Sequence, residues 1–116
     1  MRSSKNSINP SLKKQITKMF AQLICDIKNF EEAATFLEDF FNPAEIEIFS
    51  KRLAIAYWLK KKRSYKNIRD NLKVSSATIS TVSELLNKKG LKIALKKVEA
   101  EEWANLWAEK IKKIIK

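Results

Sequence analysis

Glycine and proline are scarce in this chain, and this scarcity constrains the fold more than any other feature. The 116 residues contain one glycine, Gly90, and two prolines, Pro10 and Pro43. Sheet-rich folds with many tight turns need these residues far more often. Hydrophobic residues make up 45% of the chain, which is enough for a core. The sequence therefore predicts a single all-α domain over residues 10–116, preceded by a disordered arm at residues 1–9.

Both prolines mark the start of a predicted helix. Asn9-Pro10 and Asn42-Pro43 each place a capping side chain before a proline at the first helical position. After Pro10, apolar residues recur every three or four positions and form one helical stripe. Its members are Leu12, Ile16, Met19, Phe20, Leu23, Ile24 and Ile27. Asn29 is placed to cap a shorter second helix that extends to about Phe41.

The helix expected from Pro43 to about Lys62 is apolar on two sides. One face carries Ile46, Phe49, Leu53, Ala56 and Tyr57, and another carries Ile48, Ile55, Trp58 and Leu59. A helix with two apolar faces must be covered on both. A chain this short offers few helices to do so, which predicts that a second subunit covers one face in a homodimer.

The stretch from Ser64 to Asn87 has the pattern of a helix-turn-helix. Five apolar residues, at spacings of three and four around a short turn, can lock two short helices at a steep angle: Ile68, Leu72, Val74, Ile79 and Val82. Ser64 and Ser75 stand where the two helices need N-caps. Lys73 occupies the turn position that often carries a left-handed glycine. An ordinary helical hairpin with a basic surface is the alternative interpretation.

Gly90 is expected to end the second of these helices in a left-handed conformation. The remaining segment, Leu91 to Lys116, is again periodic, and the sequence leaves open whether it forms one helix or two. The complete pattern predicts about six helices.

If the apolar residues of the motif point inward, small polar residues of its second helix point outward. Small side chains let a helix approach the edges of DNA bases closely, and basic residues surround them. The candidate DNA-binding residues are Lys66, Arg69, Lys73, Ser76, Ala77, Thr78, Ser80 and Thr81.

The basic charge is confined to one stretch around this motif. The chain has 24 Lys and Arg against 13 Asp and Glu, a net charge of +11. Residues 51–97 hold 14 of the basic residues and two acidic ones, whereas the rest of the chain is nearly neutral. Such confinement is typical of a surface that binds a polyanion. Charge and motif together predict binding to double-stranded DNA.

These motifs resemble the tryptophan repressor family. The resemblance rests on Asn42-Pro43-Ala44-Glu45, Arg52-Leu53-Ala54-Ile55, Ile68-Arg69-Asp70-Asn71-Leu72 and Ala77-Thr78-Ile79-Ser80, and it covers roughly Phe36 to Leu95. It implies an intertwined homodimer centred on the helix from Pro43, and a regulator of transcription that acts as a repressor. It also implies reading-helix contacts from Ser76, Ala77 and Ser80, a basic contact from Arg69, and phosphate contacts from Lys66 and Thr78.

The chain departs from that family at the tryptophan pocket. Arg52 matches the first of the two arginines that sandwich the indole ring, but the second falls at Thr81. The family's neighbouring glycine and serine fall at Val82 and Leu85. A blocked pocket is expected, with no tryptophan corepressor and no cofactor.

Several other classes of function are weighed against DNA binding. The chain has no histidine and one cysteine, Cys25, which argues against an enzyme, a metal site or a disulfide framework and favours a cytoplasmic location. No stretch is long and apolar enough to predict a membrane protein. Two alternatives stay open: a helical module that binds another protein, and a non-specific nucleic-acid binder, for example of RNA.

Overall fold

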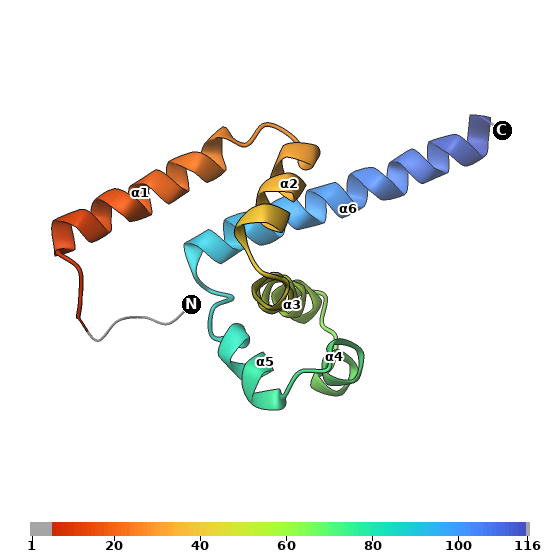
Figure 1. Cartoon of the computed structure of the whole chain (residues 1–116). Coiled ribbons are helices and arrows are strands. Elements are labelled where there is room, and N and C mark those ends of the chain that lie inside the picture. Colours follow the sequence, from red (N-terminus) through yellow and green to blue (C-terminus); the bar gives the residue numbers. More distant parts are fainter. Residues whose placement is uncertain (1–5, 116) are drawn as a thin grey trace. The chain divides into compact units, whose positions relative to one another are not determined.

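The computed structural model describes residues 6–115, and within them the side chains of all residues but Trp107 and Ile115. Over this range the chain contains six helices and no strand (Figure 1). They are α1 (Pro10–Asp26), α2 (Phe30–Phe40), α3 (Pro43–Lys60), α4 (Tyr65–Leu72), α5 (Ser76–Ser83) and α6 (Lys89–Ile115). The all-α prediction with about six helices is confirmed. Residues 1–5 of the predicted disordered arm lie outside the described residues.

The chain divides into two compact units, Met1–Pro43 and Ala44–Lys116. The first contains α1 and α2, and the second contains α3 to α6 apart from Pro43 itself. The single domain predicted over residues 10–116 stays a prediction.

Asparagine caps begin both helices of the first unit, as the sequence predicts. The Asn9 side chain accepts hydrogen bonds from the amides of Ser11 (2.8 Å) and Leu12 (3.4 Å), and the Asn29 side chain accepts one from the amide of Glu32 (2.9 Å). These bonds satisfy amides that have no partner inside the helix.

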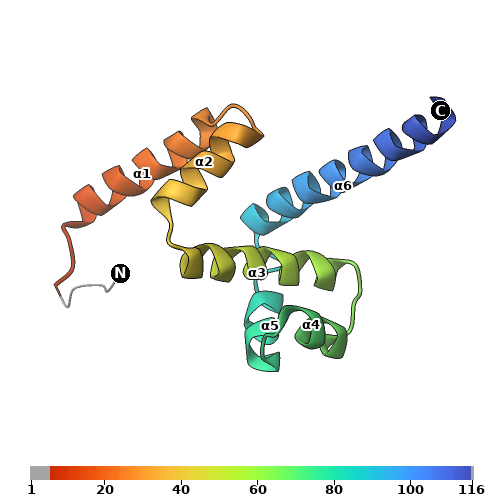
Figure 2. The ribbon, with the colours of Figure 1, turned by 45° about the vertical axis from the view of Figure 1, so that its right-hand side comes forward.

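Aromatic rings join α1 and α2, which lie side by side in Figure 2. The Phe20 ring of α1 meets the rings of Phe36 and Phe40 edge-on, with centroids 6.4 and 5.8 Å apart. Phe36 and Phe40 stack on each other at 5.0 Å. Even so, neither helix contains a buried residue.

α3 ends two residues before the sequence predicts, at Lys60, because the chain turns through a left-handed residue at Lys62 (φ 66°). The amide of Lys62 donates to the carbonyl of Leu59 (2.9 Å), and the amide of Arg63 donates to that of Trp58 (3.0 Å). Such a pair of bonds satisfies carbonyls at a helix end and prevents the helix from continuing.

The core lies in the second unit. Its buried residues come from α3, α4, α5 and α6, and they are Ile55, Ala56, Tyr57, Ile68, Ile79, Val82 and Leu95. α4 and α5 lie on one side of α3, and α6 crosses on the other (Figures 1 and 2). The C-terminal half of α3 is therefore covered on two sides, because it separates two layers of helices within the same unit. In its N-terminal half, Ile48 and Phe49 remain exposed.

The prediction for Gly90 is wrong. Gly90 lies in the first turn of α6 and has no positive φ. α5 already ends at Ser83, and short-range bonds reverse the chain without a left-handed residue. They run from the amide of Leu85 to the carbonyl of Val82 (2.9 Å) and from that of Lys88 to Leu85 (2.9 Å). The helix-turn-helix proper therefore spans residues 64–83, four residues fewer than predicted.

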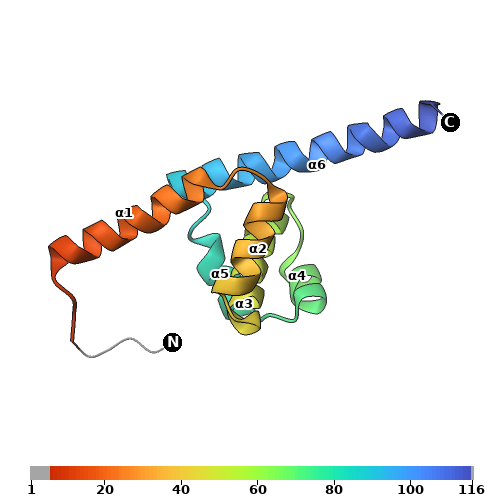
Figure 3. The ribbon, with the colours of Figure 1, turned by 45° about the horizontal axis from the view of Figure 1, so that its top comes forward.

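The sequence left open whether the last segment forms one helix or two. Residues 89–115 form a single helix, α6. Two polar contacts fasten it to α3: the Tyr57 hydroxyl donates a hydrogen bond to the Glu102 carboxylate, and Lys60 pairs with Glu99 at 3.0 Å. Beyond these contacts α6 continues away from α3 (Figure 3). Its described apolar residues there are exposed: Trp103, Leu106, Ile111 and Ile114.

Candidate nucleic-acid interface

α4 forms where Ser64 supplies its cap. The Ser64 hydroxyl accepts a hydrogen bond from the amide of Asn67 (3.1 Å). Within the helix, Ile68 is fully buried and Leu72 is half-buried, so these residues face the core as their spacing of four predicts. The polar residues between them face outward. The helix therefore presents basic side chains to solvent and apolar ones to α3 and α5.

The turn between the helices runs through Lys73 in the left-handed region (φ 56°, ψ 51°), as expected for the position that often carries glycine. The Lys73 amide donates to the carbonyl of Arg69 (2.9 Å), which ends α4. Val74 follows and is half-buried against the core. A single left-handed residue thus reverses the chain over three residues.

α5 begins with a second serine cap. The Ser75 hydroxyl accepts a hydrogen bond from the amide of Thr78 (3.1 Å) and lies 3.0 Å from the Thr78 hydroxyl. Ile79 and Val82 are buried, with exposed fractions of 0% and 3%. The orientation of α5 is fixed by these two residues, because their burial leaves only one face of the helix for solvent.

The outward face of α5 is small and polar, as predicted. Ala77, Thr78, Ser80 and Thr81 are exposed, and Ser76 is half-buried. Neither Ser80 nor Lys73 makes a side-chain hydrogen bond among the described residues, whereas the Thr81 hydroxyl donates to the carbonyl of Ala77 (3.0 Å). Every candidate residue therefore lies on the exposed side of α4, the turn or α5. Their contacts with DNA stay predictions.

Arg69 links the two helices of the motif. Its guanidinium donates a hydrogen bond to the Ser76 hydroxyl at 2.6 Å, across seven residues of sequence. The bond places a cation directly at the N-terminus of α5, where the helix dipole and the free amides also favour an anion. The sequence analysis names both residues as candidates but does not predict this contact. No spacing rule pairs two residues that lie on different helices of the motif.

Lys66 pairs with an acidic residue that the sequence prediction did not use. Its ammonium lies 2.8 Å from the Asp70 carboxylate, one helical turn away. The hydrogen bond and the charge of Lys66 lower the pKa of the Asp70 carboxyl from its usual value. The spacing of four residues is the signal that could have found this pair.

Arg63 extends the basic surface on the other side of α4. Its guanidinium lies over the Trp58 ring, 4.1 Å from the centroid, and donates to the side-chain oxygen of Asn67 (3.4 Å). The aromatic face holds the arginine in one orientation. Arg63 is not among the DNA-binding residues that the sequence predicts.

The residues at the positions that match the tryptophan pocket make contacts within this chain. The Arg52 guanidinium lies over the Phe49 ring, 5.7 Å from its centroid. Val82 is buried in the core, and Leu85 is half-buried. The blocked pocket that the resemblance implies stays a prediction.

The described part of the chain holds no group of three or more His, Cys, Asp or Glu residues able to bind a metal ion. None of its helices combines the length and apolar character that crossing a membrane requires.

Three comparisons bear on this arrangement. The family model described as "Trp repressor protein" matches residues 15–99. Over 74 residues the chain is 31% identical to "Uncharacterized protein YerC" of Bacillus subtilis, covering 64% of this chain and 70% of that protein. Its fold is similar to the crystal structure of a TrpR-like protein from Eubacterium eligens, with a TM-score of 0.69 and 32% identity. That match covers 78% of this chain and 96% of the other.

Proposed function

We propose that this chain, which belongs to the Trp repressor family, is a homodimeric regulator of transcription that binds a specific sequence of double-stranded DNA. The family consists of helix-turn-helix regulators rather than enzymes. We extend this role to the chain as a repressor, the role that the family resemblance implies. A cytoplasmic location is supported by the single cysteine of the sequence. The observation that carries the proposal is the exposed face of α5.

α5 is built to enter the major groove. The groove admits a helix, and base edges are reached most easily past short side chains. Ala77 and Ser80 are exposed. The Ser80 hydroxyl makes no side-chain hydrogen bond among the described residues and is available to a base edge, and the Ala77 methyl group can contact a base without a polar partner. Thr78 is engaged with the Ser75 cap, which suits a phosphate contact at the helix N-terminus.

The basic residues around α5 are placed for the DNA backbone. Arg69 is held at the N-terminus of α5 by Ser76, and Lys73 projects from the turn that precedes it. The Lys66 side chain is 77% exposed, and its one ion pair among the described residues is with Asp70 on its own helix. Surface pairs of this kind are weak, so a phosphate can replace the carboxylate at little cost. These cations position the motif, and the small residues read the bases.

The homodimer is supported by apolar surfaces that one chain leaves exposed. On α1, Met19 is 68% exposed and Ile24 is 57% exposed. On the N-terminal half of α3, Ile48 and Phe49 are 56% and 46% exposed. Large apolar side chains exposed within each unit are candidates for burial against a partner. A second copy is the partner that the family resemblance implies, and a two-fold dimer presents two copies of α5 to successive major grooves.

DNA binding without tryptophan is supported by the side chains at the pocket positions. Thr81 cannot stack on an indole ring as an arginine does, and its hydroxyl is bonded to the backbone of Ala77. Val82 fills the place of a glycine and is buried in the core. We propose that the protein binds its site with neither a tryptophan corepressor nor a cofactor.

Selection from a pool of random DNA duplexes tests this function. We expect enrichment of a near-palindromic sequence whose half-sites lie about one turn, ~34 Å, apart. The matched control carries Ala77→Leu and Ser80→Leu, which block the exposed face of α5 and should enrich no sequence. Equal retention of all duplexes would instead indicate a non-specific binder, and retention of none would indicate a module that binds protein. Both results would contradict the proposal.

A further inference from the structure

A cavity of about 400 Å³ lies where the end of α3 meets the beginning of α6. Its more buried wall is apolar and its exposed wall is basic. Three leucines form the first, Leu59, Leu86 and Leu95, and four lysines form the second, Lys60, Lys62, Lys92 and Lys96. No acidic residue lines it. The cavity is separate from the exposed face of α5.

Three of the four lysines have no charged partner. Lys60 pairs with Glu99 at 3.0 Å. Lys62, Lys92 and Lys96 form no ion pair among the described residues. Like charges that converge on one cavity repel each other, and an anion between them relieves that repulsion. The cavity therefore combines three uncompensated positive charges with an apolar wall.

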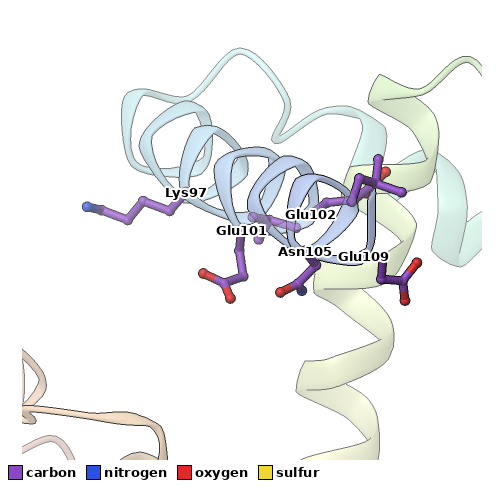
Figure 4. Close-up of a pocket in the computed structure, with 7 residues that line it drawn as sticks. Lys97, Glu101, Glu102, Asn105 and Glu109 are labelled. Atoms are coloured by element: carbon purple, nitrogen blue, oxygen red, sulfur yellow. The ribbon is translucent and has the colours of Figure 1, made fainter. Parts of the chain in front are cut away.

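Other hollows along α6 lack this combination. One is lined by Glu101, Glu102 and Glu109 with a single lysine, Lys97, and Figure 4 shows these acidic side chains spread along the helix. Another shares Lys60 and Lys96 with the basic cavity but also contains Glu99. The carboxylates disfavour an anion at both places. Of these three hollows along the described part of α6, the cavity between the leucines and the lysines is the one whose charged residues are all basic.

We propose that this cavity binds a small dianion with an apolar body, and that a phosphate monoester is the class of ligand that fits it best. Lysine ammonium groups bind phosphate oxygens as point charges, and three of them match a doubly charged group. The apolar body would lie against Leu86 and Leu95. The volume falls within the range of small-molecule sites, roughly 300–1,000 Å³.

The cavity touches both connections of the helix-turn-helix. Lys62 lies two residues before the Ser64 cap of α4, and Leu86 lies three residues after the end of α5 at Ser83. An occupant would join the two segments through which α4 and α5 are attached to the rest of their unit. An effect of the ligand on DNA affinity rests on the proposed function, whereas binding of the ligand itself does not.

Calorimetric titration of the full chain with 1-naphthyl phosphate, at constant ionic strength and without DNA, tests the site. We expect saturable binding of one ligand per chain. Lys96→Gln and Lys62→Gln should each weaken binding about tenfold, because each removes a charge from the cavity. The matched control is Lys97→Gln, which changes the next residue of α6 and lies outside the cavity. It should leave the affinity unchanged.

Four results would overturn the proposal, the last of which needs a separate measurement of duplex DNA binding. Absence of saturable binding excludes the site. Equal losses in Lys96→Gln and Lys97→Gln would mean general attraction to a protein of net charge +11. Inorganic phosphate binding as tightly as 1-naphthyl phosphate would remove any role for the leucines. Finally, Lys92→Gln and Lys96→Gln could weaken duplex DNA binding and lower its salt dependence while 1-naphthyl phosphate does not bind. The lysines would then be contacts for DNA phosphates.

Discussion

The two compact units differ in whether they bury their own apolar residues. In Ala44–Lys116, three isoleucines from three helices are fully buried: Ile55, Ile68 and Ile79. In the described part of Met1–Pro43, neither helix has a buried residue, and even the clustered rings of Phe20 and Phe40 remain 37% and 59% exposed. The second unit therefore carries its own core, to which α3, α4, α5 and α6 all contribute. The first unit carries apolar surface that needs a partner to cover it.

The largest expected effect is the loss of dimerisation on placing a charge in the first unit. Met19→Asp puts a carboxylate on the apolar face of α1 in both subunits. Burying unpaired charges should weaken the dimer by ~4 kcal/mol, roughly a thousandfold. Sedimentation equilibrium at micromolar concentration should show twice the chain mass for the original protein and 13.5 kDa for the variant.

Lys18→Asp is the matched control, because it introduces the same carboxylate one position away from the apolar stripe and should stay dimeric. A dimer that survives Met19→Asp would show that α1 does not cover the partner.

The next largest effect is the loss of stability when an isoleucine of either unit is shortened to alanine. Ile79→Ala removes a fully buried side chain and should lower the free energy of unfolding by about 3 kcal/mol at every protein concentration. Ile16→Ala removes a side chain that is 45% exposed in the single chain. The loss of unfolding free energy in Ile16→Ala should appear only at protein concentrations at which the dimer forms. Urea unfolding at several protein concentrations measures the loss of stability in both variants. If the loss in Ile79→Ala varies with protein concentration, the core of the second unit also depends on the dimer.

Local sequence signals predicted the helix starts and the motif well. Asn9, Asn29, Ser64 and Ser75 cap their helices as expected, because capping depends on residues within one turn of each other. Lys73 is left-handed, since the short turn requires it. The inward direction of Ile68 and Ile79 follows from helical spacing alone.

Features that depend on tertiary packing could not be predicted in the same way. Gly90 looked like a helix end, but α5 ends earlier through bonds among residues 82–88 that any residue type can make. The bond between Arg69 and Ser76 depends on the angle between two helices. The sequence predicted that a partner subunit covers one of the two faces of α3, whereas α6 of the same chain also packs against this helix through Leu95. The sequence pattern of α3 does not show whether an apolar face packs against a partner subunit or against another helix of the same chain.

A smaller effect compares one helix cap from each unit. Ser75→Ala removes the acceptor for the amide of Thr78 and should cost ~1 kcal/mol of stability. Asn29→Ala removes the acceptor for the amide of Glu32 at a similar cost. We expect the first loss to be independent of protein concentration and the second to weaken the dimer as well. Urea unfolding combined with sedimentation distinguishes them. Identical behaviour of the two variants would contradict the difference between the units.

The smallest effect concerns the exposed pair of Lys66 and Asp70. Lys66 lowers the pKa of the Asp70 carboxyl, so its contribution to stability is present at neutral pH and is lost as the pH falls through the folded-state pKa. NMR titration should show the pKa rising toward its usual value in Lys66→Gln. In the Met19→Asp monomer it should stay lowered, because α4 folds within its own unit. A normal pKa there would mean that the second unit depends on the dimer.

The central claim is that α5 reads the bases while the residues around it contact phosphates. Fluorescence anisotropy on the selected duplex and on a scrambled duplex, over a range of salt concentrations, tests it most directly. Lys66→Ala should weaken binding to both duplexes alike and reduce the salt slope by about one. Ala77→Leu should abolish the preference for the selected duplex and leave binding to the scrambled one intact. If both variants lose specific and non-specific binding in equal proportion, α5 is not the reading helix.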